Sequence, residues 1–305
     1  MPYAVSVPSF MPPGLHEIRV TWKSKEKQVP ERTFTFEVVN PEFGKPVVDP
    51  DAEALKAKFP GAAVAVLQQG QSSEELGLEA YAGCADAYIV RRDEWAGWNT
   101  GGKHDLVVGI YGDDNRALIR FDLTALPKGA KVEAALLKLR MDAEGHANGK
   151  YAYRVLRPWS AGTGRLGPLD ENGRIPSATG HTSRDALPGE CAWAAAKLPE
   201  SWAAPGCEKA GEDREAQALS ASITPPDAPK EKSGMRKKVW VSWELTAAAK
   251  AWAEKPETNH GVLLAVDASR QATWDEKCGV TAAYCRSSDY IDPAMRPKLI
   301  LVFRK

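Results

Sequence analysis

Apolar and polar residues alternate with a period of two across residues 105–141, and this is the clearest pattern in the chain. Ala117, Ile119 and Phe121 fall on one face of an expected strand, while the residues between them fall on the other. The Pro-Lys-Gly sequence at 127–129 predicts a tight turn, because proline presets φ and glycine tolerates positive φ. Short connections and the lack of a helical period predict an antiparallel all-β unit.

The same alternation continues on both sides of this stretch. Strands are expected at residues 62–67, 85–90, 151–158, 239–243, 261–267, 282–287 and 298–303. One short helix is expected at 245–254, where the apolar residues that share a helical face are Leu245, Ala248, Ala249 and Trp252. The pattern predicts an all-β chain, with a jelly-roll β-sandwich that has long loops and one short helix.

The chain divides into three segments. Residues 1–40 include an alternating strand at 33–38 and resemble the final hairpin of a bacterial Ig-like domain. Two or three strands do not bury a sandwich core alone, so either the chain is a fragment that lacks upstream strands or the hairpin docks elsewhere. Residues 41–80 are interpreted as a connector with a helical spacing at 51–59. Residues 81–305 form the main domain.

The composition is that of an ordinary globular protein, with 43% hydrophobic and 26% charged residues. Lys+Arg and Asp+Glu both number 40, so there is no basic field to hold nucleic acid. No apolar run reaches the roughly 18 residues that a membrane span needs. Residues 1–11 lack the cationic and apolar regions of a signal peptide. We therefore expect neither nucleic-acid binding nor a membrane span.

Five cysteines are present, and none has the spacing of a CxxC motif or a zinc site. Cys191 and Cys207 are near each other in sequence, as are Cys278 and Cys285, and each lies in a Pro/Gly-rich or polar loop. Such loop cysteines are not typical buried thiols. We predict disulfides Cys191–Cys207 and Cys278–Cys285, with Cys84 free; unpaired thiols in a reduced protein are the alternative.

The sequence carries no catalytic signature. The five histidines are isolated, and neither an HExxH motif nor a GxSxG nucleophile elbow occurs. We therefore predict that the chain is not an enzyme and requires no cofactor. Asp86 would meet Asp289 or Asp292 if the first and last strands of the main domain pair, and calcium accepts carboxylate ligands. A structural calcium bound by these residues is the corresponding prediction.

Tryptophans in loops are the candidate ligand contacts, because the apolar faces of sugar rings stack on exposed aromatic rings. If the loop at 95–98 and the insertion at 160–235 share one end of the sandwich, their tryptophans would line one groove, with arginines meeting acidic sugar groups. The alternative is that the tryptophans plug a loop-covered core. The candidate ligand-binding residues are Trp95, Trp98, Trp193, Trp202, Arg165, Arg174 and Arg184.

A series of spaced segments in the main domain follows the pattern of one family. They include ADAYI at 85–89, NTG at 99–101, LVVG at 106–109, DNR at 114–116, LIRFDL at 118–123, LPKGA at 126–130, WAAPG at 202–206, ELT at 244–246, AW at 251–252, NHG at 259–261, SSD at 287–289 and RPKL at 296–299. They resemble the DNRLRE-type (disaggregatase-related) carbohydrate-binding modules of secreted bacterial and archaeal proteins. The chain departs from that pattern at Glu244, where Asp is usual, and in its cysteine content. The resemblance implies a jelly-roll sandwich that binds glycans without cleaving them.

Two function classes follow from the sequence. The first is a non-catalytic polysaccharide-binding module of an extracellular or cell-envelope protein, either alone or as an accessory domain of a polysaccharide-degrading enzyme. The second is a structural subunit of a surface layer or fibre, in which the unpaired N-terminal hairpin contacts other protein subunits. A sandwich fold hosts both classes, so the fold does not choose between them. The residues do not identify the glycan.

Overall fold

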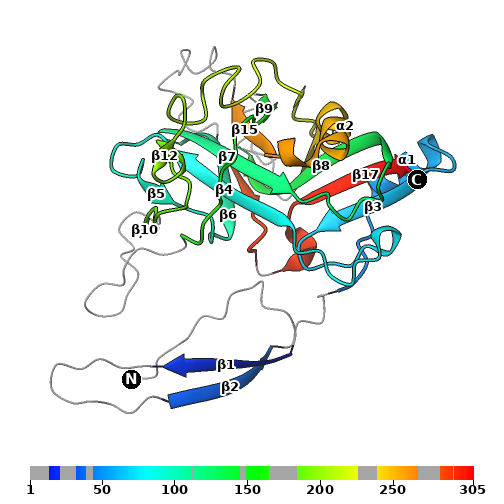
Figure 1. Cartoon of the computed structure of the whole chain (residues 1–305), viewed down its shortest axis with the longest axis horizontal. Coiled ribbons are helices and arrows are strands. Elements are labelled where there is room, and N and C mark those ends of the chain that lie inside the picture. Colours follow the sequence, from blue (N-terminus) through cyan, green and yellow to red (C-terminus); the bar gives the residue numbers. More distant parts are fainter. Residues whose placement is uncertain are drawn as a thin grey trace, which may run out of the picture.

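Figure 1 shows the chain as a computed structural model. β1 (Gly14–Val20) and β2 (Arg32–Val38) pair as the antiparallel hairpin expected in the N-terminal segment. The other strands form an antiparallel sandwich, which confirms the predicted all-β class. The residues that the structure describes are 14–20, 32–38, 44–111, 113–144, 149–164, 184–225, 239–266, 282–290 and 292–305.

The first sheet is built around β8 (Lys131–Glu144), and we call it the β8 sheet. β8 pairs with β14 (Val239–Glu244) along one edge. Along the other edge it pairs first with β17 (Lys298–Arg304) and then with β16 (Ala283–Arg286). β3 (Ala63–Gln68) lies outside β17 as an edge strand, so this sheet brings together segments from both ends of the sandwich sequence.

The second sheet, the β7 sheet, has the strand order β4, β7, β15, β9 and β13. β6 (Asp105–Tyr111) joins the two sheets, because its first residues pair with β16 and its last residues pair with β7. All these pairings are antiparallel. The bounds of the five strands are β4 (Cys84–Val90), β7 (Asp113–Phe121), β15 (Val262–Val266), β9 (Lys150–Arg154) and β13 (Ser220–Ala221).

The main hydrophobic core lies between the two sheets. Ala117, Ile119 and Phe121 of β7 are buried in it, which confirms the core face predicted from the alternation. From Ala135 to Met141, every second side chain of β8 faces the core. A register irregularity near the start of the strand lets Val132 also face the core. The predicted helix is α2 (Thr246–Glu254), which packs Ala248, Ala249 and Trp252 against this core.

A second hydrophobic cluster covers the outer face of the β7 sheet. Ala87 and Ile89 alternate with the core residues of β4, so their side chains point to the other side of the sheet. Trp159 and Trp202, from the long insertion, pack on this face. The insertion therefore forms a covering layer that includes the short strands β11 (Ala195–Lys197) and β12 (Glu200–Ser201), which pair with each other.

The predicted Cys191–Cys207 disulfide is wrong, because both residues are free thiols buried in this second cluster. Burial raises the pKa of Cys191 to about 12, so the thiol is protonated at neutral pH. The prediction treated loop cysteines as exposed, whereas this loop is itself a layer of core. Cys84 is free, as predicted. Cys278 lies outside the described residues, so the Cys278–Cys285 bond stays a prediction.

The segment interpreted as a connector belongs to the sandwich. β3 pairs with β17 along six residues, from Lys298↔Gln68 to Phe303↔Ala63. Asp49 caps the N-terminus of α1 (Pro50–Lys58), the helix expected from the 51–59 spacing, by accepting a hydrogen bond from the Asp51 amide. The sandwich therefore begins near residue 44 and not at residue 81.

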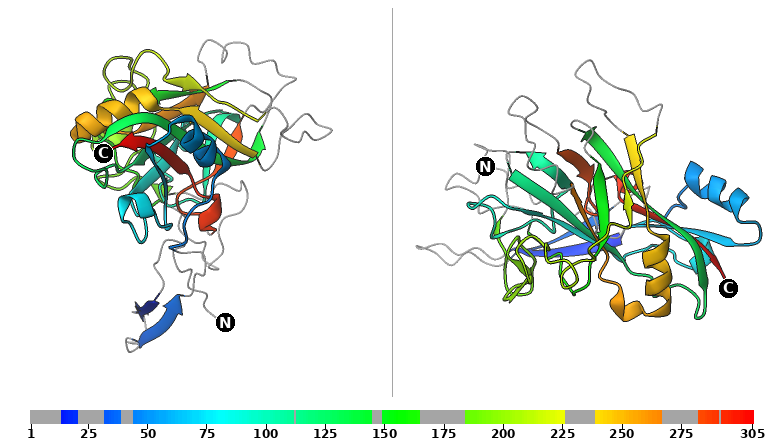
Figure 2. Two further views of the ribbon diagram at one scale, coloured as in Figure 1. Left: turned by 90° about the vertical axis from the view of Figure 1, so that its right-hand side faces the viewer. Right: turned by 90° about the horizontal axis from the view of Figure 1, so that it is seen from above.

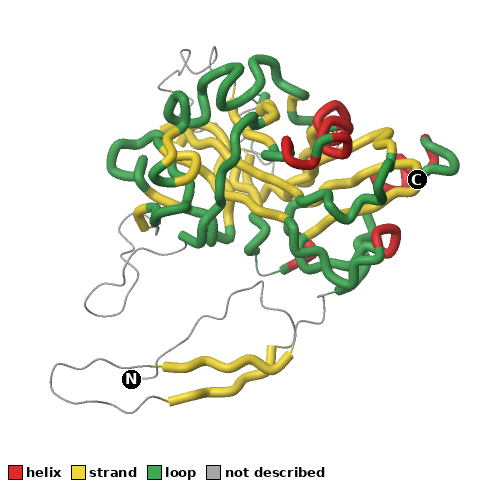
Figure 3. Tube along the Cα trace, in the orientation of Figure 1, coloured by secondary structure: helices red, strands yellow, loops and turns green. Residues whose placement is uncertain are grey.

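Helices and loops are unevenly placed around the sheets. Figure 3 shows the helices toward the end of the sandwich where the C-terminus lies, and long loops over the opposite end. In the right-hand view of Figure 2, α1 and α2 both lie near the C-terminal strand β17.

In the described part of the chain, no helix is long and apolar enough to cross a membrane. The single-turn helices are η1 (Glu74–Leu76), η2 (Pro256–Thr258) and η3 (Pro293–Met295).

Candidate functional site

The loop at 91–104 and the insertion lie side by side at the end of the sandwich where β4 ends and β7 begins. Within the first loop, β5 (Trp98–Asn99) pairs with β10 (Arg184–Asp185) of the insertion. The Trp193 amide donates to the Ala96 carbonyl at 3.1 Å, and the Ala186 amide donates to the Gly97 carbonyl at 2.8 Å. These main-chain contacts bring together the two loops that carry the predicted ligand-binding residues, and we call this surface the loop end.

Asn99 fixes the conformation of the loop end and was not among the predicted site residues. Its side-chain amide donates to the carbonyls of Ala161 (2.7 Å) and Cys191 (2.9 Å). Its side-chain oxygen accepts from the amides of Gly101 (3.2 Å) and Gly164 (2.7 Å). A Cβ on Gly101 would lie 2.1 Å from the Ala161 carbonyl oxygen, so only glycine fits there. The sequence signal that could have identified Asn99 was an asparagine followed by Gly101 in its own loop, together with Gly164 in the insertion.

Trp95 and Trp98 form a stacked pair, with ring centroids 5.2 Å apart and an interplanar angle of 22°. The Arg92 guanidinium also lies over the Trp95 ring, 4.2 Å from its centroid, so little aromatic surface of Trp95 is left for a ligand. A cavity of about 10 Å³ lies beneath the pair, which is room for about one water. A ligand at this place therefore meets the outer surface of Trp98, which is half-buried.

Trp193 is also half-buried, and its ring is held from two sides. The Arg116 guanidinium lies 5.0 Å from the ring centroid. A Cβ on Gly206 would come within 2.6 Å of the ring, so the Gly206 backbone packs directly against it. Arg116 itself forms ion pairs with Asp114, at 2.7 Å, and with Glu208. Arg116 is only 6% exposed, so these ion pairs lie beneath the covering insertion.

Trp202 is placed differently from the other predicted ligand contacts. It is only 4% exposed, and its indole N–H donates to the Ala192 carbonyl at 3.0 Å. The ring packs in the second hydrophobic cluster, where Trp159 makes the corresponding bond to the His260 carbonyl at 2.7 Å. This is the position of a core residue. Among the four predicted tryptophans, Trp202 is therefore buried, whereas Trp95, Trp98 and Trp193 are half-buried at the loop end.

Arg184 is committed to an ion pair within the loop end. Its guanidinium binds both carboxylate oxygens of Glu190, at 2.6 and 2.7 Å. The same carboxylate accepts from the amides of Leu187 (2.9 Å) and Thr163 (3.0 Å). The bond from Arg184 is the main cause that lowers the pKa of Glu190 to about 2. Arg165 and Arg174 lie outside the described residues, so their predicted role stays a prediction.

The predicted calcium ligands fall into two groups. Asp86 is 2% exposed and accepts a hydrogen bond at 2.7 Å from the amide of Ser288, the residue before Asp289. Asp292 instead accepts from the Ala294 amide at 3.0 Å and caps a helical turn. In the ranges that the structure describes, no three His, Cys, Asp or Glu side chains are gathered as metal ligands would be. Calcium binding stays a prediction.

Asp86 is expected to make stability depend on pH. Burial, and next the charge of Asp289, raise its pKa from the ordinary 3.8 to about 7. The folded protein therefore holds a proton that the unfolded chain releases above pH 4. This stabilisation is complete below about pH 4 and is lost as the pH rises through 7. The free energy of unfolding should fall by about 2 kcal/mol between pH 5 and pH 7 from this group.

Urea unfolding at a series of pH values would test this expectation, with Asp86→Asn as the matched control. Asparagine keeps an oxygen to accept from Ser288 but does not titrate, so the difference between the two proteins isolates Asp86. The same pH dependence in both proteins would mean that Asp86 has an ordinary pKa.

No protein-family model matches the chain, and no curated protein matches it in sequence. The likeness to DNRLRE-type modules therefore rests on the spaced motifs alone.

Proposed function

We propose that the chain is a non-catalytic, glycan-binding module of an extracellular or cell-envelope protein. The observation that carries the proposal is the pair of half-buried rings, Trp98 and Trp193, on two loops joined by main-chain hydrogen bonds. Sugar rings stack on aromatic surfaces of this kind. Because Asn99 holds both loops, a glycan would bind a surface that is already ordered and would lose little free energy in ordering it.

Glu190, a carboxylate of the loop end, is not available for acid–base catalysis of hydrolysis. Glu190 has a pKa of about 2 and is held by Arg184 and two backbone amides. A general acid needs a pKa near the working pH, and a general base needs a free lone pair directed at its substrate. Glu190 meets neither need. The motifs similar to those of DNRLRE-type modules support the same function.

A structural subunit is the second candidate, and the N-terminal hairpin favours it. In the β1–β2 register, Phe34 is the partner of Ile18 and Phe36 is the partner of His16. A two-stranded hairpin is marginally stable alone. Its edges are suited to pairing with strands of another copy.

A glycan array followed by titration of one bound polysaccharide tests the proposal. We expect a Kd in the micromolar to millimolar range, roughly 4–8 kcal/mol. Trp98→Ala should weaken binding about tenfold, which corresponds to about 1.4 kcal/mol of lost stacking. The matched control is Trp240→Ala, because Trp240 is also half-buried but lies on the β8 sheet beside Lys298. Equal loss in both variants, or no binding to any glycan together with assembly on a sizing column, would favour the structural subunit.

A further inference from the structure

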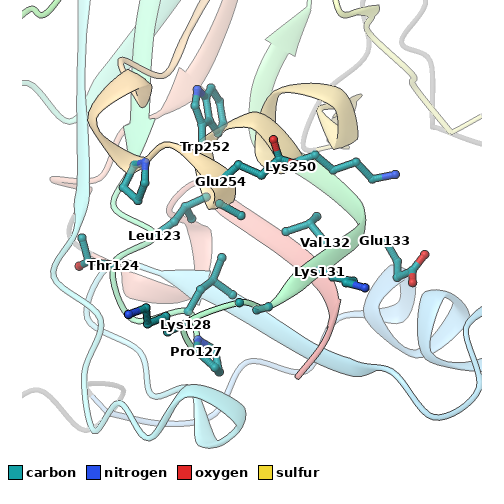
Figure 4. Close-up of a pocket in the computed structure, with 15 residues that line it drawn as sticks. Leu123, Thr124, Pro127, Lys128, Lys131, Val132, Glu133, Lys250, Trp252 and Glu254 are labelled. Carbon is teal, nitrogen blue, oxygen red and sulfur yellow. The ribbon is translucent and has the colours of Figure 1, made fainter.

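A groove of the sandwich lies at the opposite end from the tryptophan loops. β7 begins at the loop end and finishes at Phe121, and the turn that follows it faces α2. Between that turn, at residues 123–133, and the helix lies a groove of about 890 Å³. Figure 4 shows its two walls, with Lys128 and Pro127 on the turn and Lys250 on the helix. The volume is in the range of ligand-binding sites.

The floor of the groove is aliphatic. Leu126, Val132 and Ala253 line it. Trp252 also belongs to the lining, but it is only 3% exposed and Figure 4 shows its indole pointing away from the other lining side chains. A sugar would find no open aromatic face here on which to stack. Aliphatic side chains of a partner fit this floor better than a sugar ring does.

The rim of the groove is basic. Lys128, Lys131 and Lys250 are all exposed, and within the described part of the chain none of them forms an ion pair. Two acidic residues line the groove, Glu133 and Glu254. Glu133 forms an ion pair with Arg304 at 3.3 Å, so its charge is already balanced. The positive charges on both walls therefore outnumber the free negative charge, and an acidic partner would be attracted and oriented.

Both walls are anchored before any partner arrives. The Thr246 hydroxyl, at the start of α2, accepts from the Ala135 amide of β8 at 2.9 Å, and the Leu245 amide donates to the Ala135 carbonyl at 2.9 Å. On the turn, the Asp122 carboxylate accepts from the Thr124 amide at 2.9 Å and from its hydroxyl at 3.0 Å. A preformed groove of this kind costs little free energy to order on binding.

We propose that this groove, between the turn at 123–133 and α2, binds an extended peptide segment that carries both acidic and aliphatic side chains. The aliphatic side chains of the segment contact the floor, and its carboxylates meet Lys128 and Lys131 on one wall and Lys250 on the other. This site is separate from the loop end, so the proposal does not depend on glycan binding.

Fluorescence polarisation with a labelled octapeptide of alternating Asp and Leu tests the proposal on the full chain. We expect saturable binding that weakens at least tenfold between about 50 mM and about 500 mM salt, because exposed charges are screened. A matched octapeptide of alternating Lys and Leu should not bind. Failure of the acidic peptide to bind at low salt, or equal binding of the basic one, would overturn the proposal.

Lysine variants test whether the acidic peptide binds in this groove. Lys128→Glu/Lys250→Glu should weaken the acidic peptide at least tenfold, and Lys128→Gln/Lys250→Gln should weaken it less, because charge is removed without being reversed. The matched control is Lys197→Glu/Lys209→Glu, two exposed lysines of the insertion, which should bind as the original chain does. Equal loss in the control, or no loss in either groove variant, would refute the assignment. Displacement of the peptide by tetragalacturonate at a lower concentration than unlabelled peptide would show an acidic-sugar site instead.

Discussion

Replacing Asp49 by alanine is expected to lower the free energy of unfolding by about 3–5 kcal/mol. Asp49 is 2% exposed, and its carboxylate contacts the ammonium groups of Lys138 at 2.6 Å and Lys298 at 3.2 Å. Burial alone would raise the pKa of Asp49, but the bond from Lys138 and the charge of Lys298 bring it below its ordinary value. Without the carboxylate, Lys298 would lose the carboxylate that it contacts, and Lys138 would keep only the half-exposed Asp51.

Asp51→Ala is the control for this prediction. Asp51 also contacts Lys138, at 2.6 Å, but its side chain is 50% exposed, so its removal should cost no more than about 1 kcal/mol. Urea unfolding of both variants measures the two costs. An Asp49→Ala cost as small as that of Asp51→Ala would mean that the segment before α1 is not docked on the β8 sheet in solution.

The same ion pairs explain why the start of the sandwich could not be predicted from the sequence. Asp49 lies 89 residues from Lys138 and 249 residues from Lys298 along the chain. Such contacts leave no periodic pattern, whereas strands and helices that pack by an apolar face do. β7, β14 and α2 were therefore predictable, while residues 41–80 were interpreted as a connector outside the main domain.

The candidate site was predictable only in part, for a related reason. The sequence predicted a groove on the condition that the two tryptophan loops share one end of the sandwich. The main-chain bonds between Ala96 and Trp193 and between Gly97 and Ala186 join these loops. It did not indicate that the insertion covers the outer face of the β7 sheet. Arg120 alternates with core residues and reads as exposed, yet its guanidinium lies 5.8 Å from the Trp159 ring centroid. A covering loop has no repeat that reveals which of its side chains are buried.

Trp202→Ala is expected to lower the free energy of unfolding by about 3–5 kcal/mol, because it empties a large volume in the second hydrophobic cluster. It also leaves the Ala192 carbonyl without its indole donor. Trp202→Phe should cost less, about 1–2 kcal/mol, since most of the apolar volume stays and mainly the N–H is lost. Urea unfolding of the three proteins gives these differences.

For Trp98→Ala, at the same loop end, we expect the opposite result from Trp202→Ala, a small effect on stability. Trp98 is half-buried and stacks on Trp95, so its removal should cost no more than about 1 kcal/mol of stability. Its effect should instead appear in glycan affinity, which Trp202→Phe should leave unchanged. If Trp202→Phe abolished glycan binding without a change in stability, Trp202 would be a ligand contact in solution, and the loop layer would have to open to admit the glycan.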